Sequence, residues 1–163
     1  MENTIRKAKK EAEVEEVQYV TFVIGEELYG VDVTKVQEII GMTPITVVPN
    51  SAIFMRGVIN LRGAVVPVVD MRSRFSMVDK SYDFFTVIII VEVHARLVGM
   101  IVDSVSDVVK LPVGSIQSTP SFNAKIETDF IEGIGQIENN LVAILDVDKI
   151  LTVEEIPAHA ATA

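Results

Sequence analysis

The alternation of apolar and polar positions predicts that the chain is built mainly from short β-strands. The pattern is clearest in residues 56–75, RGVINLRGAVVPVVDMRSRF, where two apolar runs flank an Arg-Gly pair. Gly63 supplies the positive φ that the second position of a two-residue hairpin turn requires. Pro67 has no N–H for a sheet ladder, so we expect the second strand to lie at a sheet edge or to carry a bulge. Asp70 is placed to cap a short helix directly after it.

The same pattern predicts strands in the rest of the chain. A hairpin is expected over residues 18–33, with its turn at Gly25. A long apolar strand is expected over residues 84–93, pairing back with residues 96–102, and a last hairpin over residues 130–145. Because residues 84–93 are almost continuously apolar, we expect this strand to be buried on both faces or to lie at a junction.

The predicted strands fall into two similar halves. Residues 30–39 match residues 99–108, and residues 54–70 match residues 130–146. Units of this size are marginally stable alone, so we expect the two halves to share a hydrophobic core. Closure of each half into a small barrel would remove its exposed strand edges.

These boundaries give an expected domain organisation. One all-β domain spans residues 17–153 and divides into two barrels, at approximately residues 17–83 and 84–153. The flanking residues 1–16 and 154–163 carry no periodic apolar face, so we expect both to be disordered tails that folding does not require.

Composition narrows the class of partner. Hydrophobic residues make up 49% of the chain, which allows a sizeable core, and the net charge is −9. An acidic chain is a poor candidate for binding nucleic acid or an anionic membrane surface. The chain has no cysteine, which excludes disulfides, thiol catalysis and cysteine-ligated zinc. No apolar run is long enough to span a bilayer, so we expect a cytoplasmic protein without membrane insertion.

The residues that usually carry catalysis or bind metal do not form a recognisable constellation. His94 lies in a predicted turn and His159 in a predicted tail, and neither has a Ser or carboxylate partner that would complete a triad. The Asp-x-Asp pair at Asp146 lacks the Gly and Glu of an EF-hand loop, and Asp146 is better explained as a helix cap. The Gly-x-Gly at Gly133 runs into a hairpin rather than a helix, so it is not a dinucleotide fingerprint. We expect no enzyme activity, cofactor or metal.

Each repeat contains one apolar ridge, and each ridge flanks one carboxylate. The ridges flank Glu38 and Asp107 and consist of Val36, Ile39, Ile40, Val105, Val108 and Val109. They could line a groove between the barrels, and plain core packing remains the alternative for each of them. Arg62 stands at a hairpin tip in an acidic protein, where it is either a contact residue or a solvated turn residue.

The stretches VQYVTFVIGEELYGVDVTKVQEIIG, RGVINLRGAVVPVVDMRSRF, GMIVDSVSDVV and FIEGIG resemble the CheW family of bacterial chemotaxis coupling proteins over about residues 18–152. The resemblance implies two five-stranded β-barrels, similar to SH3 barrels, packed around a shared hydrophobic core with short helical turns. It also implies a non-catalytic adaptor between transmembrane chemoreceptors and the histidine kinase CheA. The partners would be the receptor cytoplasmic tips and the regulatory domain of CheA, and the protein would be a monomer in isolation that assembles in receptor arrays.

Eight residues match the family's receptor- and kinase-coupling region by position: Val36, Glu38, Ile39, Gly57, Arg62, Val87, Val105 and Val108. For Gly57 and Gly133 a backbone requirement is an equal alternative, because some φ values suit only glycine. Two other interpretations of the chain remain open. The same module occurs in CheV, fused to a receiver domain, and at the end of CheA. An unrelated enzyme would be indicated by turnover or nucleotide binding of the purified protein.

Overall fold

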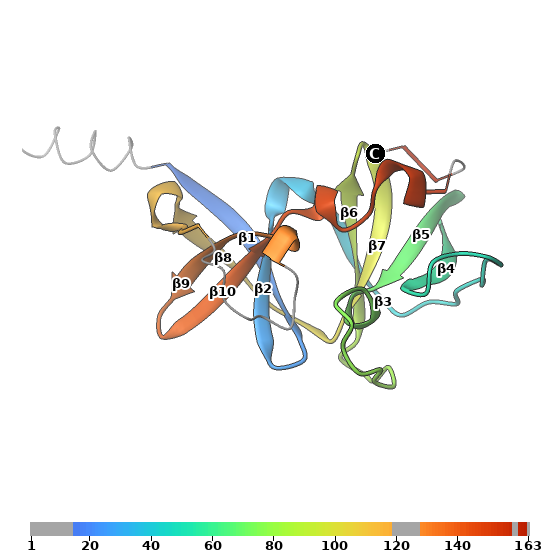
Figure 1. The fold of residues 1–163 in the computed structure, drawn as a ribbon, viewed down its shortest axis with the longest axis horizontal. Helices are drawn as coiled ribbons and strands as arrows, with labels where there is room; N and C mark the ends of the chain where they lie inside the picture. Colours follow the sequence, from blue (N-terminus) through green and yellow to red (C-terminus); the bar gives the residue numbers. More distant parts are fainter. Residues whose placement is uncertain (1–14, 119–127, 158–159, 163) are drawn as a thin grey trace, which may run out of the picture.

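Ten strands form two five-stranded sheets in the computed structural model, which describes residues 15–118, 128–157 and 160–162 (Figure 1). Sheet A has the order β8-β1-β2-β10-β9 and consists of β1 (Glu16–Ile24), β2 (Glu27–Asp32), β8 (Ser104–Pro112), β9 (Ile131–Ile137) and β10 (Asn140–Leu145). Sheet B has the order β3-β6-β7-β5-β4 and consists of β3 (Val36–Gly41), β4 (Met55–Leu61), β5 (Ala64–Asp70), β6 (Val87–Val93) and β7 (Arg96–Val102).

Helical structure is limited to short turns among the described residues. They are α2 (Met71–Arg74) and the 3-10 turns η1 (Val33–Lys35), η2 (Val113–Ser115), η3 (Thr128–Phe130), η4 (Val147–Lys149) and η5 (Val153–Glu155). The expected cap is confirmed, since the Asp70 carboxylate accepts the N–H groups of Arg72 and Ser73 at the start of α2. Asp146 caps η4 in the same way.

Each sheet is almost closed by a single pair of residues. Thr46, beyond the end of β3, exchanges two hydrogen bonds of 2.8 Å with Val58 in β4. Gln117, beyond β8, pairs in the same way with Ile134 in β9. The all-β prediction with two five-stranded units is therefore confirmed, although the sheets are bridged at one point rather than closed into continuous barrels.

The two sequence repeats exchange their first hairpins, so a barrel division at residues 17–83 and 84–153 is wrong. Strands β1 and β2 join β8–β10 in sheet A, and β6 and β7 join β3–β5 in sheet B. Figure 1 shows the blue β1 and β2 beside the orange β10. Equivalent hairpins present equivalent edges, so the sequence match does not specify which copy pairs with which strands. The short link η1 carries the chain from sheet A into sheet B, and Asp103 carries it back.

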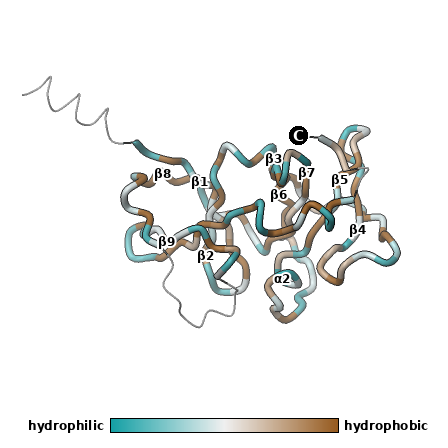
Figure 2. The backbone as a smooth tube through the Cα atoms, turned by 45° about the horizontal axis from the view of Figure 1, so that its top comes forward, coloured by the Kyte–Doolittle hydropathy of each residue, from teal (hydrophilic) through white to brown (hydrophobic). Residues whose placement is uncertain are grey.

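A shared hydrophobic core lies between the sheets, as expected. It includes Phe22 and Tyr29 from sheet A and Ile89 and Met100 from sheet B, all fully buried. Each nearly closed sheet also surrounds a smaller hydrophobic core of its own, which we call the interior of that sheet. Figure 2 shows hydrophobic, brown segments along β6 and β7 in the middle of the molecule.

Strand β6 explains the long apolar run. Ile89 and Val91 belong to the shared core, whereas Ile88 and Ile90 belong to the interior of sheet B, so both faces are buried. The strand starts at Val87, later than expected, and Phe84 before it is 95% exposed.

The prediction for Pro67 is wrong, because β5 lies inside sheet B, between β4 and β7. The bulge in this pair of strands lies in β4 rather than in β5, because the register shifts between Met55 and Gly57. Pro67 is tolerated because the ladder from β5 to β7 begins one residue later, at Val68 opposite Gly99.

The C-terminal segment is also not the disordered tail that the sequence predicts. Ile156 and Ala160 are buried in the shared core, and Ala161 hydrogen-bonds to Val65 in β5 and to Leu97 in β7. Main-chain hydrogen bonds and alanines leave no periodic apolar pattern, which is why the sequence did not show this. The predicted N-terminal tail lies outside the described residues up to position 14, and β1 already begins at Glu16.

We expect deletion of residues 154–163 to destabilise the protein. Loss of the buried Ile156 side chain alone should cost about 1.5–3 kcal/mol, which corresponds to a fall in Tm of roughly 3–12 °C for a domain of this size. Thermal unfolding measures the effect, and deletion of residues 1–14 is the control that should leave Tm unchanged. An unchanged Tm after the C-terminal deletion would show that the segment does not contribute to the fold.

Candidate interaction site

An exposed ion pair joins two of the residues selected from the sequence. Arg62, at the tip of the β4–β5 hairpin, donates to both carboxylate oxygens of Glu38 in β3. These two residues come from opposite ends of sheet B, and the Thr46–Val58 pair brings those ends together. The Arg62 side chain is 70% exposed, so the pair lies at the surface.

Local backbone geometry positions this pair. Arg62 and Gly63 both have positive φ, at 52° and 87°, which is the expected two-residue hairpin turn. The Asn60 side-chain oxygen accepts the N–H of Gly63 at 2.7 Å and fixes the turn. The hydrogen bond from Arg62 lowers the pKa of the Glu38 carboxyl, and the charge of Arg62 lowers it further. The site therefore presents one positive and one negative group held together.

Three apolar candidates lie on strands β3 and β6 of the same sheet. Val36 and Val87 are half-buried and pack against the shared core, and Ile39 is 41% exposed. Ile39 is opposite Ile89 in the ladder, so its side chain lies on the face of sheet B that is turned toward the shared core. Ile39 is thus the candidate that a partner can reach most directly, whereas Val36 also has a packing role.

The remaining valines lie on the other sheet. Val105 in β8 is half-buried and packs against the shared core, and Val108 is 51% exposed opposite Val20 in β1. The candidates therefore come from both sheets, and Val36, Val87 and Val105 all pack against the shared core between the sheets. In Figure 1 the η1 link crosses between the sheets at the top and the link to β8 crosses at the bottom.

Gly57 is explained by the backbone. Its φ is +145°, and a Cβ atom there would lie 2.1 Å from the carbonyl oxygen of Thr46, at the pair that nearly closes sheet B. Gly133 is its equivalent in sheet A, where a Cβ atom would lie 2.9 Å from the carbonyl oxygen of Gln117. Both glycines permit the close approach that brings the ends of each sheet together, which favours the backbone alternative for both.

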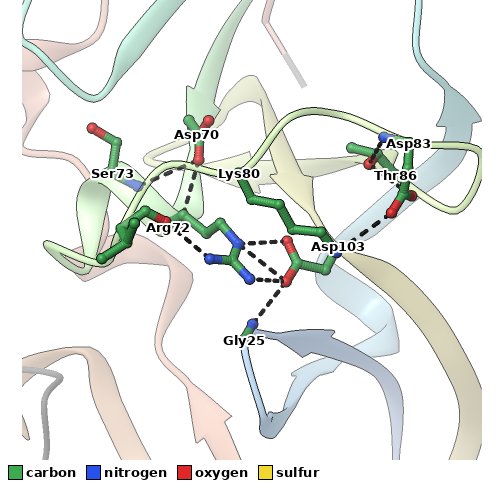
Figure 3. Close-up of polar contacts among 9 residues, drawn as sticks. Gly25, Asp70, Arg72, Ser73, Lys80, Asp83, Thr86 and Asp103 are labelled. Carbon is green, nitrogen blue, oxygen red and sulfur yellow. Dashed lines mark hydrogen bonds and ion pairs between the residues drawn. The ribbon is translucent and has the colours of Figure 1, made fainter.

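Sequence reasoning missed a polar cluster between the sheets (Figure 3). The Asp103 carboxylate, in the link from β7 to β8, accepts bonds of 2.7 to 3.1 Å from the Arg72 guanidinium in α2. It also accepts the N–H of Gly25, at the β1–β2 turn of sheet A, at 2.8 Å. Burial would raise the pKa of Asp103, but the bonds from Arg72 and Gly25 lower it below its ordinary value.

This cluster fixes the two sheets relative to each other, because Asp103 binds one group from each side of the junction. In the sequence, the one signal for this role was that Asp103 lies between two predicted strands. Its partners Arg72 and Gly25 are distant in sequence, so the contacts themselves could not be predicted. Within the described parts of the chain, no group of three His, Asp or Glu residues is arranged to hold a metal ion. Nor is any helix there long and apolar enough to cross a membrane.

The chain is similar to chemotaxis proteins over nearly its whole length. A family model described as the CheW-like domain matches residues 18–155. The chemotaxis protein CheW of Klebsiella aerogenes is 38% identical over 138 residues, which cover 85% of this chain and 83% of that protein. The CheW of Thermotoga maritima is 31% identical over 153 residues, covering 91% and 93%.

A solved structure agrees with these relatives. The crystal structure of the scaffolding protein TtCheW from Thermoanaerobacter tengcongensis matches with a TM-score of 0.81 and 32% identity, covering 90% of this chain and 94% of that one. The solved structure is that of a scaffolding protein, and the relatives are named as chemotaxis proteins. With the two five-stranded sheets and the shared core, these similarities show that the chain belongs to the family of CheW-like domains, as a scaffolding or coupling protein of chemotaxis.

Proposed function

We propose that the chain is a non-catalytic adaptor that couples chemoreceptors to the histidine kinase CheA. The observation that carries the proposal is the placement of exposed apolar residues on both sheets, with Ile39 on sheet B and Val108 on sheet A. Two separate surfaces on one scaffold allow two partners to be held at once. The Asp103 cluster and the shared core would keep the two surfaces in a fixed relation.

The receptor surface is proposed on strands β3 and β6 of sheet B. An amphipathic helix at the receptor tip would place its apolar stripe against Ile39 and the exposed parts of Val36 and Val87. The Glu38–Arg62 pair at the edge of the same sheet would set the orientation of the helix through charged contacts. The kinase regulatory domain would bind elsewhere on the molecule, end to end with one of the sheets.

Ile39→Glu tests the receptor surface. Placing a charge against an apolar helix should weaken receptor binding by roughly thirtyfold or more, about 2 kcal/mol, while Tm and binding of the kinase regulatory domain stay unchanged. Titration of the purified chain against a receptor cytoplasmic fragment and against the kinase domain measures each affinity separately. Leu141→Glu, at an exposed apolar position on sheet A, is the matched control for receptor binding. Equal weakening by both variants would contradict the assignment.

The Glu38–Arg62 pair gives a second test of the same surface. Because the pair is exposed, Arg62→Ala should leave Tm unchanged. Arg62→Glu should weaken receptor binding at least about tenfold, because it places two like charges together and removes the pairing. Exchanging both charges, Glu38→Arg with Arg62→Glu, should restore most of that loss if the two side chains act as a unit. If the fold-loss in receptor affinity of the double variant equals the product of the two single-variant losses, each side chain contacts the partner independently.

A further inference from the structure

A gap opens between β5 and β7 at the end of sheet B where their ladder stops. Parallel pairing joins Val68 to Gly99 and continues to Asp70 opposite Ile101. Pro67, one residue earlier, has no N–H to donate, so the pairing does not continue beyond it. Beyond this point the Val65 carbonyl and the Leu97 N–H each bond to a third segment of the chain instead of continuing the ladder.

The C-terminal segment of the chain fills this gap as a short added strand. The Ala161 N–H donates to the Val65 carbonyl at 2.9 Å, and the Ala161 carbonyl accepts the Leu97 N–H at 2.9 Å. The Arg96 side chain donates to the Ala160 carbonyl at 2.6 Å, and Thr162 is the bridge partner of Arg96. Figure 1 shows the end of the chain lying beside β7 and β5.

The contacts define the ligand chemistry that the gap accepts. They are made mainly by the main chain, as in other cases where an extended peptide adds to a sheet. The side chains must be small, because Ala160 is only 3% exposed and Ala161 packs against the interior of sheet B. The equivalent of Pro67 in sheet A is Ala143, which pairs with Tyr29, so the corresponding ladder extends one residue further in sheet A.

Few side chains of the segment leading into the gap are buried. An open cavity of about 480 Å³ lies beside it, lined by His94, Arg96, Val153, Glu154, Ile156 and Pro157. Within the described part of this segment beyond η5, only Ile156 and Ala160 are buried. A short strand held by few side-chain contacts can leave its position without unfolding the sheets.

We propose that the gap between β5 and β7 is a binding site for an extended peptide with small side chains, and that its second occupant is the C-terminal segment of another copy of the chain. The hydrogen bonds made within one copy and between two copies are the same. The balance is therefore set by the effective concentration of the tethered segment, which is in the millimolar range for a short tether. Dilute protein keeps its own segment, whereas crowded copies exchange segments and become linked.

The chain has no cysteine, which allows a direct test by disulfide trapping. Full-length Arg96→Cys and Thr162→Cys chains, one carrying a size tag, are mixed under oxidising conditions. The two positions are bridge partners, so their Cα atoms lie within the range of a disulfide when the segment is in place. Relative to the intramolecular rate in the double variant, the rate of heterodimer formation should be roughly a hundredth at ~10 µM and similar at ~1 mM.

Two controls make the result decisive. Thr162→Cys mixed with Leu141→Cys, at an exposed position on sheet A, reports random collisions. Ala161→Pro removes the N–H that binds Val65, so adding it to the Thr162→Cys chain should reduce the heterodimer rate to that of the collision control. A heterodimer rate no higher than the collision control at every concentration would overturn the proposal, as would a heterodimer rate that Ala161→Pro leaves unchanged.

Discussion

Gly57→Ala is expected to unfold the protein or to lower its stability by more than about 4 kcal/mol, the range of severe backbone and packing defects. A Cβ atom would lie 2.1 Å from the Thr46 carbonyl oxygen and 2.7 Å from its carbonyl carbon, and both are backbone atoms that cannot move aside without breaking the pair with Val58. The φ of +145° adds strain for any residue other than glycine. Chemical denaturation measures the change.

Gly63→Ala is the matched control for this effect. Gly63 also has positive φ, but no atom lies within 4 Å of the position of its Cβ. Its substitution should therefore cost only the backbone strain, about 1 kcal/mol. If Gly57→Ala instead melts like the wild type and loses only partner binding, then Gly57 is a contact residue and the close approach at Thr46 is not a structural requirement.

Asp103→Asn should lower the free energy of unfolding by about 2–4 kcal/mol, because it leaves the largely buried Arg72 guanidinium without its charged partner. The loss also weakens the bond to Gly25, so the effect includes the contact between the sheets. Asp79→Asn is the control, since Asp79 forms an exposed ion pair with Arg56 and should change stability by less than about 1 kcal/mol. Equal effects of the two substitutions would contradict a special role for the Asp103 cluster.

The difference in stability between wild type and Asp103→Asn should decrease at low pH. The folded-state pKa of Asp103 is lowered, so its contribution to stability is fully present above the unfolded carboxyl pKa of about 4. It is lost as the pH falls through the lowered folded-state pKa. The stability gap between wild type and Asp103→Asn should thus be constant from pH 7 to about 5 and shrink below about 4. A gap that stays constant down to pH 2 would show that Asp103 does not titrate with a lowered pKa.

Local features of the fold could be predicted from the sequence because nearby residues determine them. The turn at Gly63 and the cap at Asp70 depend on the conformational preferences of a few adjacent residues, and both are confirmed. The repeat identified equivalent strands, since Gly57 and Gly133 meet the same requirement in the two sheets.

Features that depend on the choice among equivalent partners could not be predicted. The hairpin exchange between the repeats is one, because the edge that β2 offers to β10 is equivalent to the edge that β7 offers to β5. The bond between Arg72 and Asp103 is another, because the two residues are far apart in sequence and neither stands out there. Of the candidate residues, Glu38 and Arg62 are brought together, whereas Val105 and Val108 lie on the other sheet.

An adaptor must hold a receptor and a kinase domain on one copy of the chain at the same time. The most direct measurement is the composition of the complex formed by the purified chain, a receptor cytoplasmic fragment and the CheA regulatory domain, determined by sedimentation with each component labelled in turn. We predict a complex that contains all three, in which saturation with the kinase domain leaves receptor affinity unchanged or increased. If the receptor fragment displaces the kinase domain, or if either fails to bind, the adaptor account is contradicted.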